Sequence, residues 1–220
     1  MQRSYQMYII PDVIDPKGFE SFSTQLNLSF KGISENPIEP GARIEPESAK
    51  ELPEISLLNF SETPKLYTIV MVDPDEPNQE IQSYAEQCHW AVCNVKFDIF
   101  NQKYSPESGN GETAIKYTPP HPAYGTKTHR YIFVALLQGE NGTLKISPDE
   151  FLKFNGLRSF TKDHNLTPVG VSFFRSEWNQ TVDKIYTDVL GVKPPRFGLP
   201  LVENPNIGKD GEKLPAYENI

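Results

Sequence analysis

Short apolar runs separated by polar, proline-containing stretches dominate the pattern of this chain. Three runs, Leu66–Val72, Trp90–Val95 and Tyr131–Leu137, are rich in β-branched and aromatic residues, which is typical of buried strands. Leu26–Phe30 alternates apolar and polar residues, as a strand with one buried face does. The pattern therefore predicts a mostly β or α+β protein.

Two helices are expected in the C-terminal third of the chain. For the first, Ser147 and Glu150 have the spacing of a capping box around Pro148, and apolar residues from Phe151 to Leu157 supply a buried side. The dipeptide at 155–156, Asn-Gly, is a candidate interruption of this helix.

The second helix is expected to begin at a Ser176 cap and to stop at Gly191. Its apolar residues recur at three- and four-residue spacing from Trp178 to Val189. This face must be covered, either by the body of the same chain or, around Trp178, by a partner chain.

Acidic and histidine residues gather at the ends of the predicted strands. The first run leads into Asp73–Pro77 (DPDEP), and His89 and His129 lie beside the other two runs. Because proline fixes φ and removes a backbone donor, we expect the strand to stop here and its acids to project from a rigid turn. We therefore expect one compact concavity that contains Asp73, His89, Pro120 and His129.

Composition limits the class of protein. With 220 residues, 37% of them hydrophobic and 23% charged, the chain suits one globular domain. It has no apolar run of the roughly 18 residues that a membrane span needs and no hydrophobic signal region, so we expect a soluble protein. Cys88 and Cys93 are expected on opposite faces of one strand, which argues against an internal disulfide and fits a reducing compartment.

The charge balance bears on the kind of partner. Twenty-nine acids against 21 bases give a net charge of −8, whereas nucleic-acid binders depend on clustered Lys and Arg. RNA contact is therefore expected only at local basic spots. The alternative is that these basic residues form ordinary solvent-exposed surface. The spots are Lys153, Arg158 and Lys162, and Lys193 with Arg196.

Five stretches of the chain resemble the phosphatidylethanolamine-binding protein family. They are Ile10–Pro16, Tyr67–Pro77 with its Asp-Pro-Asp-x-Pro motif, Cys88–Asn94, Gly125–Phe133 with its His-Arg pair, and Phe154–Phe174. The resemblance covers residues 8–175 and implies an antiparallel β-sandwich with a few peripheral helices and a small anion pocket at its surface.

Carried over residue by residue, the resemblance implies a ligand pocket of seven residues. They are Asp73, Asp75, Tyr84, His89, Pro120, His129 and Tyr131. The histidines, the tyrosine hydroxyls and backbone N–H groups can hold a phosphate or carboxylate, while the acids orient the histidines or Arg130. The alternative is that these bonds only fasten the Asp-Pro turn to neighbouring strands and that the pocket is vestigial.

Metal binding and catalysis are less favoured. The acids and histidines of the pocket are ligand types that zinc and non-haem iron use, but their spacing matches no compact zinc signature. Catalysis needs a nucleophile held by a base. Cys88 is expected on the opposite face from His89, and Cys93 about 13 Å from His89 along the strand. We expect no metal, no cofactor and no enzymatic turnover.

Two departures from the family pattern are similar to its branch in the mitochondrial large ribosomal subunit. Eight residues, His121–Thr128, separate the paired prolines from His129, where fewer are usual, and Phe173–Leu190 followed by Lys193–Phe197 extends past the usual end of the fold. The resemblance implies a structural protein of the mitochondrial matrix that contacts neighbouring mitochondrial ribosomal proteins and, to a limited extent, rRNA.

The end of the chain is expected to act separately from the body. Residues 1–191 are predicted to form the domain and residues 192–220 an extended proline-containing tail that binds a partner. The candidate partner-binding residues are Trp178, Pro194, Pro195, Arg196 and Phe197. The alternative function is a free cytoplasmic protein that binds an anion or phospholipid and inhibits a kinase or peptidase. Composition does not separate the two.

Overall fold

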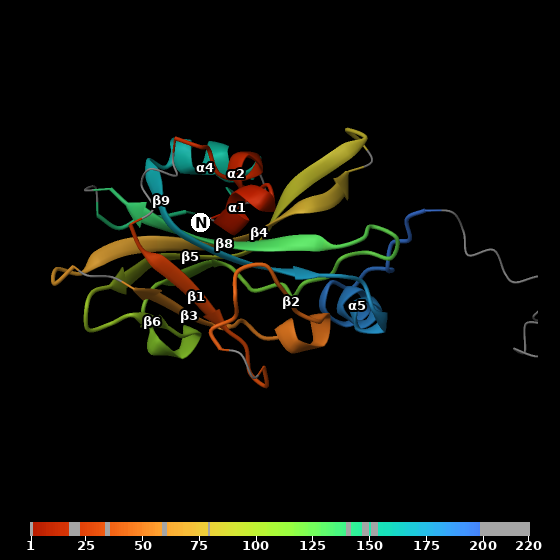
Figure 1. The fold of residues 1–220 in the computed structure, drawn as a ribbon, viewed down its shortest axis with the longest axis horizontal. Coiled ribbons are helices and arrows are strands. Elements are labelled where there is room, and N and C mark those ends of the chain that lie inside the picture. Colours follow the sequence, from red (N-terminus) through yellow and green to blue (C-terminus); the bar gives the residue numbers. More distant parts are fainter. Residues whose placement is uncertain are drawn as a thin grey trace, which may run out of the picture.

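Two β-sheets pack face to face, and helices cover the outer face of the larger sheet (Figure 1). The computed structural model describes residues 2–198 except 18–22, 34–35, 59–60, 79, 140–141, 147–149 and 151–153. Within these ranges the small sheet has the order β1-β3-β6 and the large sheet the order β2-β9-β8-β4-β5-β7. All pairs are antiparallel except β2 with β9. The predicted mostly β sandwich with peripheral helices is confirmed.

The elements have these bounds. The strands are β1 Gln25–Ser29, β2 Ala42–Arg43, β3 Glu54–Leu58, β4 Lys65–Asn78, β5 Ser83–Phe97, β6 Lys103–Tyr104, β7 Glu112–Ile115, β8 His129–Gln138 and β9 Leu166–Ser176. The helical elements are α1 Gln2–Gln6, α2 Ile9–Asp12, η2 Pro46–Ala49, η3 Pro106–Ser108, α4 Leu157–Asp163, α5 Gln180–Lys184 and the π-helix η4 Ile185–Val189. In the described part of the chain, no helix is both long and apolar enough to cross a membrane.

Two apolar clusters lie on the two faces of the large sheet. Leu28 of the small sheet and Phe133 of β8 belong to the cluster between the sheets. Val134 of β8 belongs to the cluster that Ile10 and Phe160 of the helices cover. Because β4 and β8 are covered on both faces, their sequences are continuous apolar runs instead of alternating patterns.

The prediction that the first strand ends at the Asp-Pro motif is wrong. Strand β4 continues to Asn78 and forms with β5 a hairpin that projects beyond the sheet, drawn in yellow in Figure 1. A register shift between Asp73 and Glu76 accommodates Pro74, and Pro77 is paired opposite Tyr84. The pairing of β4 with β8 reaches only Val72, so Pro74 and Pro77 lie where the ladder is one-sided and a missing N–H is tolerated.

The expected cap of the second helix is also wrong. Ser176 is the last residue of β9 and pairs with His129 of β8, so the strand continues through it. Asn179 caps α5 instead, because its side chain accepts a hydrogen bond of 2.9 Å from the backbone N–H of Thr181. Gly191, with φ of 68°, follows the end of η4 as predicted.

The first predicted helix lies partly outside the described residues. Its proposed cap, residues 147–149, and residues 151–153 are among those not described. The described helix α4 begins at Leu157, directly after Gly156 with φ of 90°. The predicted interruption therefore coincides with the start of a helix.

Candidate functional site

Four polar side chains from three strands meet on one face of the large sheet. Asp73 shares the face of Met71 on β4, and His129 shares the face of Tyr131 on β8, because side chains alternate along a strand. His89 comes from β5, and its ring centroid lies 5.2 Å from that of Tyr131. Asp73, His89, His129 and Tyr131 are each no more than 1% exposed. The expected concavity is therefore a buried cluster.

His129 carries a positive charge in this cluster. Its Nδ1 lies 2.7 Å from Oδ2 of Asp73, and its Nε2 lies 2.7 Å from Oγ1 of Thr126. The Thr126 hydroxyl donates to the carbonyl of Ala123 at 2.8 Å, so it accepts from Nε2, and both ring nitrogens are protonated. Burial opposes this charge, but the hydrogen bond to Asp73 and its negative charge raise the pKa of His129 overall. The same contact lowers the pKa of Asp73 against its burial.

His89 is in the opposite protonation state. Its Nδ1 lies 3.0 Å from the carbonyl of Thr118, which only accepts, so Nδ1 carries the hydrogen. Burial lowers the pKa of His89, although the charge of Asp73 opposes this, and leaves the ring neutral. Neither Nε2 of His89 nor the hydroxyl of Tyr131 has a hydrogen-bond partner within the described ranges. Two buried polar atoms are thus available to a water or a ligand.

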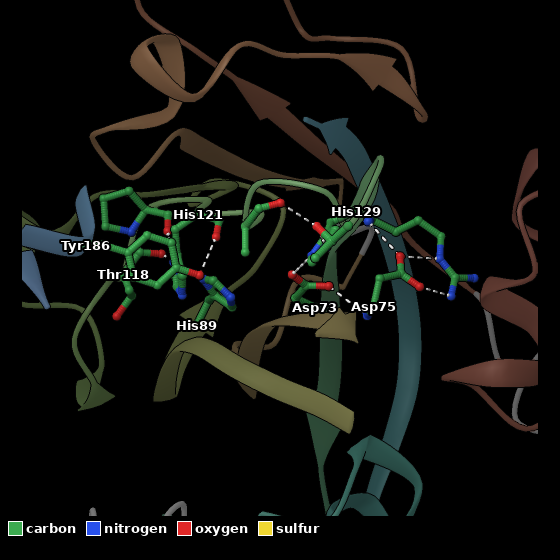
Figure 2. A network of polar contacts seen from close by, with 11 residues as sticks. Asp73, Asp75, His89, Thr118, His121, His129 and Tyr186 are labelled. Atoms are coloured by element: carbon green, nitrogen blue, oxygen red, sulfur yellow. Dashed lines mark hydrogen bonds and ion pairs between the residues drawn. The ribbon is translucent and has the colours of Figure 1, made fainter. Parts of the chain in front are cut away.

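A third histidine, His121, packs against this cluster and was not anticipated from the sequence. Its ring centroid lies 4.7 Å from that of His89, and Nδ1 donates to the carbonyl of Pro119 at 2.7 Å. Burial, followed by the neighbouring His89, lowers the pKa of His121 to about 4. Tyr186 lies beside it (Figure 2), and the Tyr186 hydroxyl donates to the His121 carbonyl at 3.0 Å. The sequence feature that could have indicated His121 as a site residue is its position directly after the paired prolines.

The other three carried-over residues are not among these four side chains. Asp75 accepts from the backbone N–H and Nε of Arg130 at 2.9 and 2.8 Å and from Nη2 at 2.7 Å, which fastens β4 to β8 (Figure 2). Tyr84 is 63% exposed on the projecting hairpin. Pro120 is buried in the segment that leads to His121. The structure therefore unites four of the seven residues, and their role in binding a ligand stays a prediction.

A surface groove of about 520 Å³ lies between the projecting hairpin and the segment 125–127. Its lining comprises Pro77, Asn78, Gln82, Ser83, Tyr84, Gly125, Thr126, Lys127 and Phe197. Thr126 also contacts His129. This side chain therefore separates the groove from the buried cluster.

Three ligand atoms in the cluster are close enough to share a metal ion. One atom each of Asp73, Glu76 and His129 lie within 4.8 Å of one another. Burial, followed by the charge of Asp73, raises the pKa of Glu76 to about 7. Because hydrogen bonds occupy both nitrogens of His129, a metal would have to displace Asp73 or Thr126 from that ring. The expected absence of a metal stays a prediction.

The two cysteines are poor nucleophiles. Both are free, and burial raises the pKa of Cys88 to about 12 and that of Cys93 to about 11. The Cys88 thiol donates to the carbonyl of Trp90 at 3.4 Å. Because the thiolate is the reactive form of cysteine, these side chains do not provide a nucleophile at neutral pH.

The described part of the predicted tail lies against the body of the chain. The Arg196 guanidinium stacks 5.1 Å from the ring centre of Tyr124 and 5.4 Å from that of Trp178, and its Nη2 lies 2.6 Å from Oδ2 of Asp183. Tyr124 and Trp178 also contact each other edge to face at 4.7 Å. Residues 199–220 lie outside the described residues. A role of Trp178, Pro194, Pro195, Arg196 and Phe197 in binding a partner stays a prediction.

Comparison with known proteins relates the chain to one family. The family model described as phosphatidylethanolamine-binding protein matches residues 34–174. The chain is 26% identical over 182 residues to the large ribosomal subunit protein mL38 of Schizosaccharomyces pombe, a match that covers 81% of this chain and 56% of that protein. It is 24% identical to the carboxypeptidase Y inhibitor of Saccharomyces cerevisiae, with 79% of this chain and 93% of the inhibitor covered.

Solved structures share the fold. A phosphatidylethanolamine-binding protein from Plasmodium vivax superposes with a TM-score of 0.63 at 18% identity, covering 81% of this chain and 97% of the other. A carboxypeptidase Y inhibitor in complex with its cognate proteinase superposes with a TM-score of 0.61 at 23% identity, covering 80% and 93%.

Proposed function

Because the chain belongs to the phosphatidylethanolamine-binding protein family, we propose that it uses this fold as a structural protein of the mitochondrial large ribosomal subunit, acting mainly through protein contacts. The observation that carries the proposal is that residues of the chain itself occupy part of its polar site. Thr126 occupies one nitrogen of His129, and His121 packs on His89. A site occupied in this way leaves the outer surface as the working part of the molecule.

Two further observations support this role. The residues that fill the site come from the segment His121–Thr128, whose length is similar to that of the ribosomal branch of the family. The net charge of −8 favours protein partners over extended contact with rRNA. The similarity to mL38 suggests mitochondrial ribosomal proteins as those partners and the matrix as the location.

Sedimentation of the native protein tests the proposal. Mitochondrial lysate from cells that carry the tagged full chain is separated on a sucrose gradient, and the tag is followed together with a known protein of the large subunit. We expect the tag to sediment with the large subunit and to stay there at moderate salt, because protein contacts depend less on ionic strength than phosphate contacts do. A tag found only at the top of the gradient would contradict a ribosomal role.

The orphaned atoms of the cluster favour a second candidate function. Nε2 of His89 and the Tyr131 hydroxyl are buried without partners in the described structure, which is the state of a site that awaits a small polar ligand. The second candidate is therefore an anion-binding protein that inhibits a kinase or peptidase, of which the name of the carboxypeptidase Y inhibitor suggests the peptidase. Slowing of a purified carboxypeptidase by the full chain, combined with no ribosomal sedimentation, would favour this candidate.

A further inference from the structure

The segment at 193–198, here called the strap, contacts residues 124–125, and the neighbouring Thr126 contacts His129 of the buried cluster. The backbone N–H of Phe197 donates to the carbonyl of Tyr124 at 2.9 Å, and Arg196 pairs with Tyr124 as an isolated parallel bridge. Gly125 has φ of 90°, and a Cβ at this position would overlap the carbonyl of Phe197. The strap therefore lies directly on the segment 119–128, here called the loop.

Arg196 fastens the strap to α5 as well. Its guanidinium lies over both the Tyr124 and the Trp178 ring, which contact each other, and forms an ion pair with Asp183. Asp183 also accepts from Nε1 of Trp178 at 3.0 Å, which fixes the indole in place. One arginine side chain thus holds the loop, the strap and α5 together.

The loop in turn closes the polar cluster. The Thr126 hydroxyl bonds to the carbonyl of Ala123 and to Nε2 of His129, and the Tyr186 hydroxyl holds the carbonyl of His121. The groove outside Thr126 has Phe197 of the strap as one wall. Displacement of the strap therefore frees the loop residue that separates the groove from His129.

We propose that the strap keeps the loop closed over the cluster, and that an oxyanion such as inorganic phosphate binds there only after the strap is released. With Thr126 withdrawn, the charged Nε2–H of His129 has no partner and, with the Tyr131 hydroxyl, becomes a donor for the anion. The fastening contacts suit a releasable element, because ion pairs and cation–π contacts that are partly exposed contribute little individually. The choice of an oxyanion as the ligand rests on the second candidate function. The proposal that the strap holds the loop closed does not depend on that function.

Two variants release the strap by different means. Arg196→Ala removes the clamp, and Gly125→Ala places a methyl group under the strap. Arg3→Ala is the matched control, because it removes another exposed arginine that pairs with an acid, Glu39, at 3.0 Å. Circular dichroism and urea denaturation confirm that each full-length variant is folded before measurement.

Amide hydrogen exchange tests the strap independently of any ligand. We expect exchange in peptides covering 119–128 to rise at least tenfold in Arg196→Ala and Gly125→Ala and to stay unchanged in Arg3→Ala. Unchanged exchange in both strap variants would overturn the proposal that the strap holds the loop closed.

Phosphate titration followed by NMR of the His129 ring tests the ligand. We expect shifts that saturate with at least tenfold lower Kd in both strap variants than in the parent chain or in Arg3→Ala. Equal affinity in all four proteins would overturn gating by the strap. Faster loop exchange without phosphate binding would overturn the proposal that an oxyanion is the ligand. It would still support the proposal that the strap holds the loop closed.

Discussion

His129 and Asp73 form an ion pair between two adjacent central strands, with 2.7 Å between Nδ1 and Oδ2 and no more than 1% of either side chain exposed. A buried pair of this kind stabilises a fold only while both partners are present, because a single buried charge lacks compensation. Most of what we expect from substitutions in the cluster follows from this dependence.

Asp73→Asn should destabilise the protein strongly. The change keeps the side-chain volume but leaves the His129 charge buried without its partner, which typically costs about 3–5 kcal/mol. Urea denaturation at pH 6 measures the loss. Asp12→Asn is the control, because Asp12 pairs with Arg130 while 47% of its side chain is exposed, and the expected cost there is below about 1 kcal/mol. Equal costs for the two substitutions would contradict a coupled buried pair.

The cost of Asp73→Asn should also depend on pH. The folded-state pKa of His129 is raised, so its contribution is complete below the unfolded value of about 6.5 and is lost as the pH rises through the folded value. The folded-state pKa of Asp73 is lowered, so its contribution is present above about 3.9 and is lost as the pH falls through its folded value. Denaturation midpoints from pH 4 to 9 should differ most between the parent and Asp73→Asn at pH 4–6.5. A difference that grows above pH 8 would be inconsistent with a charged His129.

Glu86→Gln should flatten the fall of stability between pH 5 and pH 8. Burial raises the pKa of Glu86 to about 7, so the folded state binds more protons than the unfolded state between about 4.5 and 7, and stability falls as the pH rises across this window. Glutamine keeps an oxygen for the backbone N–H of Leu157, which Glu86 accepts at 2.7 Å. The free energy of unfolding at pH 5 minus that at pH 8 should shrink in Glu86→Gln. It should not change in Glu51→Gln, whose side chain is 74% exposed.

Gly125→Ala should cost more than Gly109→Ala. Both glycines have positive φ, 90° and 65°, so both substitutions carry the strain of about 1–2 kcal/mol that a Cβ adds in this region. Only at Gly125 does the added Cβ meet the strap, and overpacking adds about 1–3 kcal/mol, whereas no atom lies within 4 Å of a Cβ at Gly109. Urea denaturation of the two variants side by side gives the difference. Equal losses would mean that the strap does not press on Gly125.

The thiols of Cys88 and Cys93 should be unreactive in the folded protein. Their pKa values of about 12 and about 11 leave almost no thiolate at pH 8. Ellman's reagent should therefore detect two thiols in guanidinium chloride and fewer than one within minutes in buffer. Rapid titration of both thiols in buffer would show that this part of β5 opens readily.

The central strands could be predicted from the sequence because few residue types are compatible with a strand that is buried on both faces. β4 and β8 are buried on both faces, so Leu66–Val72 and Tyr131–Leu137 must be apolar throughout. The continuation of β4 through Asp73–Asn78 was missed because strand prolines are tolerated wherever a strand has a ladder on one side only. Such one-sided pairing depends on where another strand ends, which local sequence does not specify.

The candidate site was predicted only in part, because strand alternation groups some of its residues and tertiary contacts bring in the others. Alternation along a strand places Asp73 with Met71 and His129 with Tyr131, so these residues could be grouped from spacing and family resemblance. The turn of Asp75 towards Arg130 depends on the neighbouring strand β8, and the packing of His121 on His89 depends on a loop that tertiary contacts hold to Tyr186 and Arg196. The contacts of the loop with Tyr186 and Arg196 join segments more than fifty residues apart, beyond the reach of local patterns.

The prolines of the projecting hairpin also bear on self-association. Beyond Val72, β4 is not paired with β8 within the described ranges, and an open strand edge of this kind is a template for pairing with another molecule. Pro74 and Pro77 have no N–H to offer, so this edge lacks two of the donors that an incoming strand would need. The two prolines of the Asp-Pro-Asp-x-Pro motif therefore protect the exposed hairpin against intermolecular sheet formation.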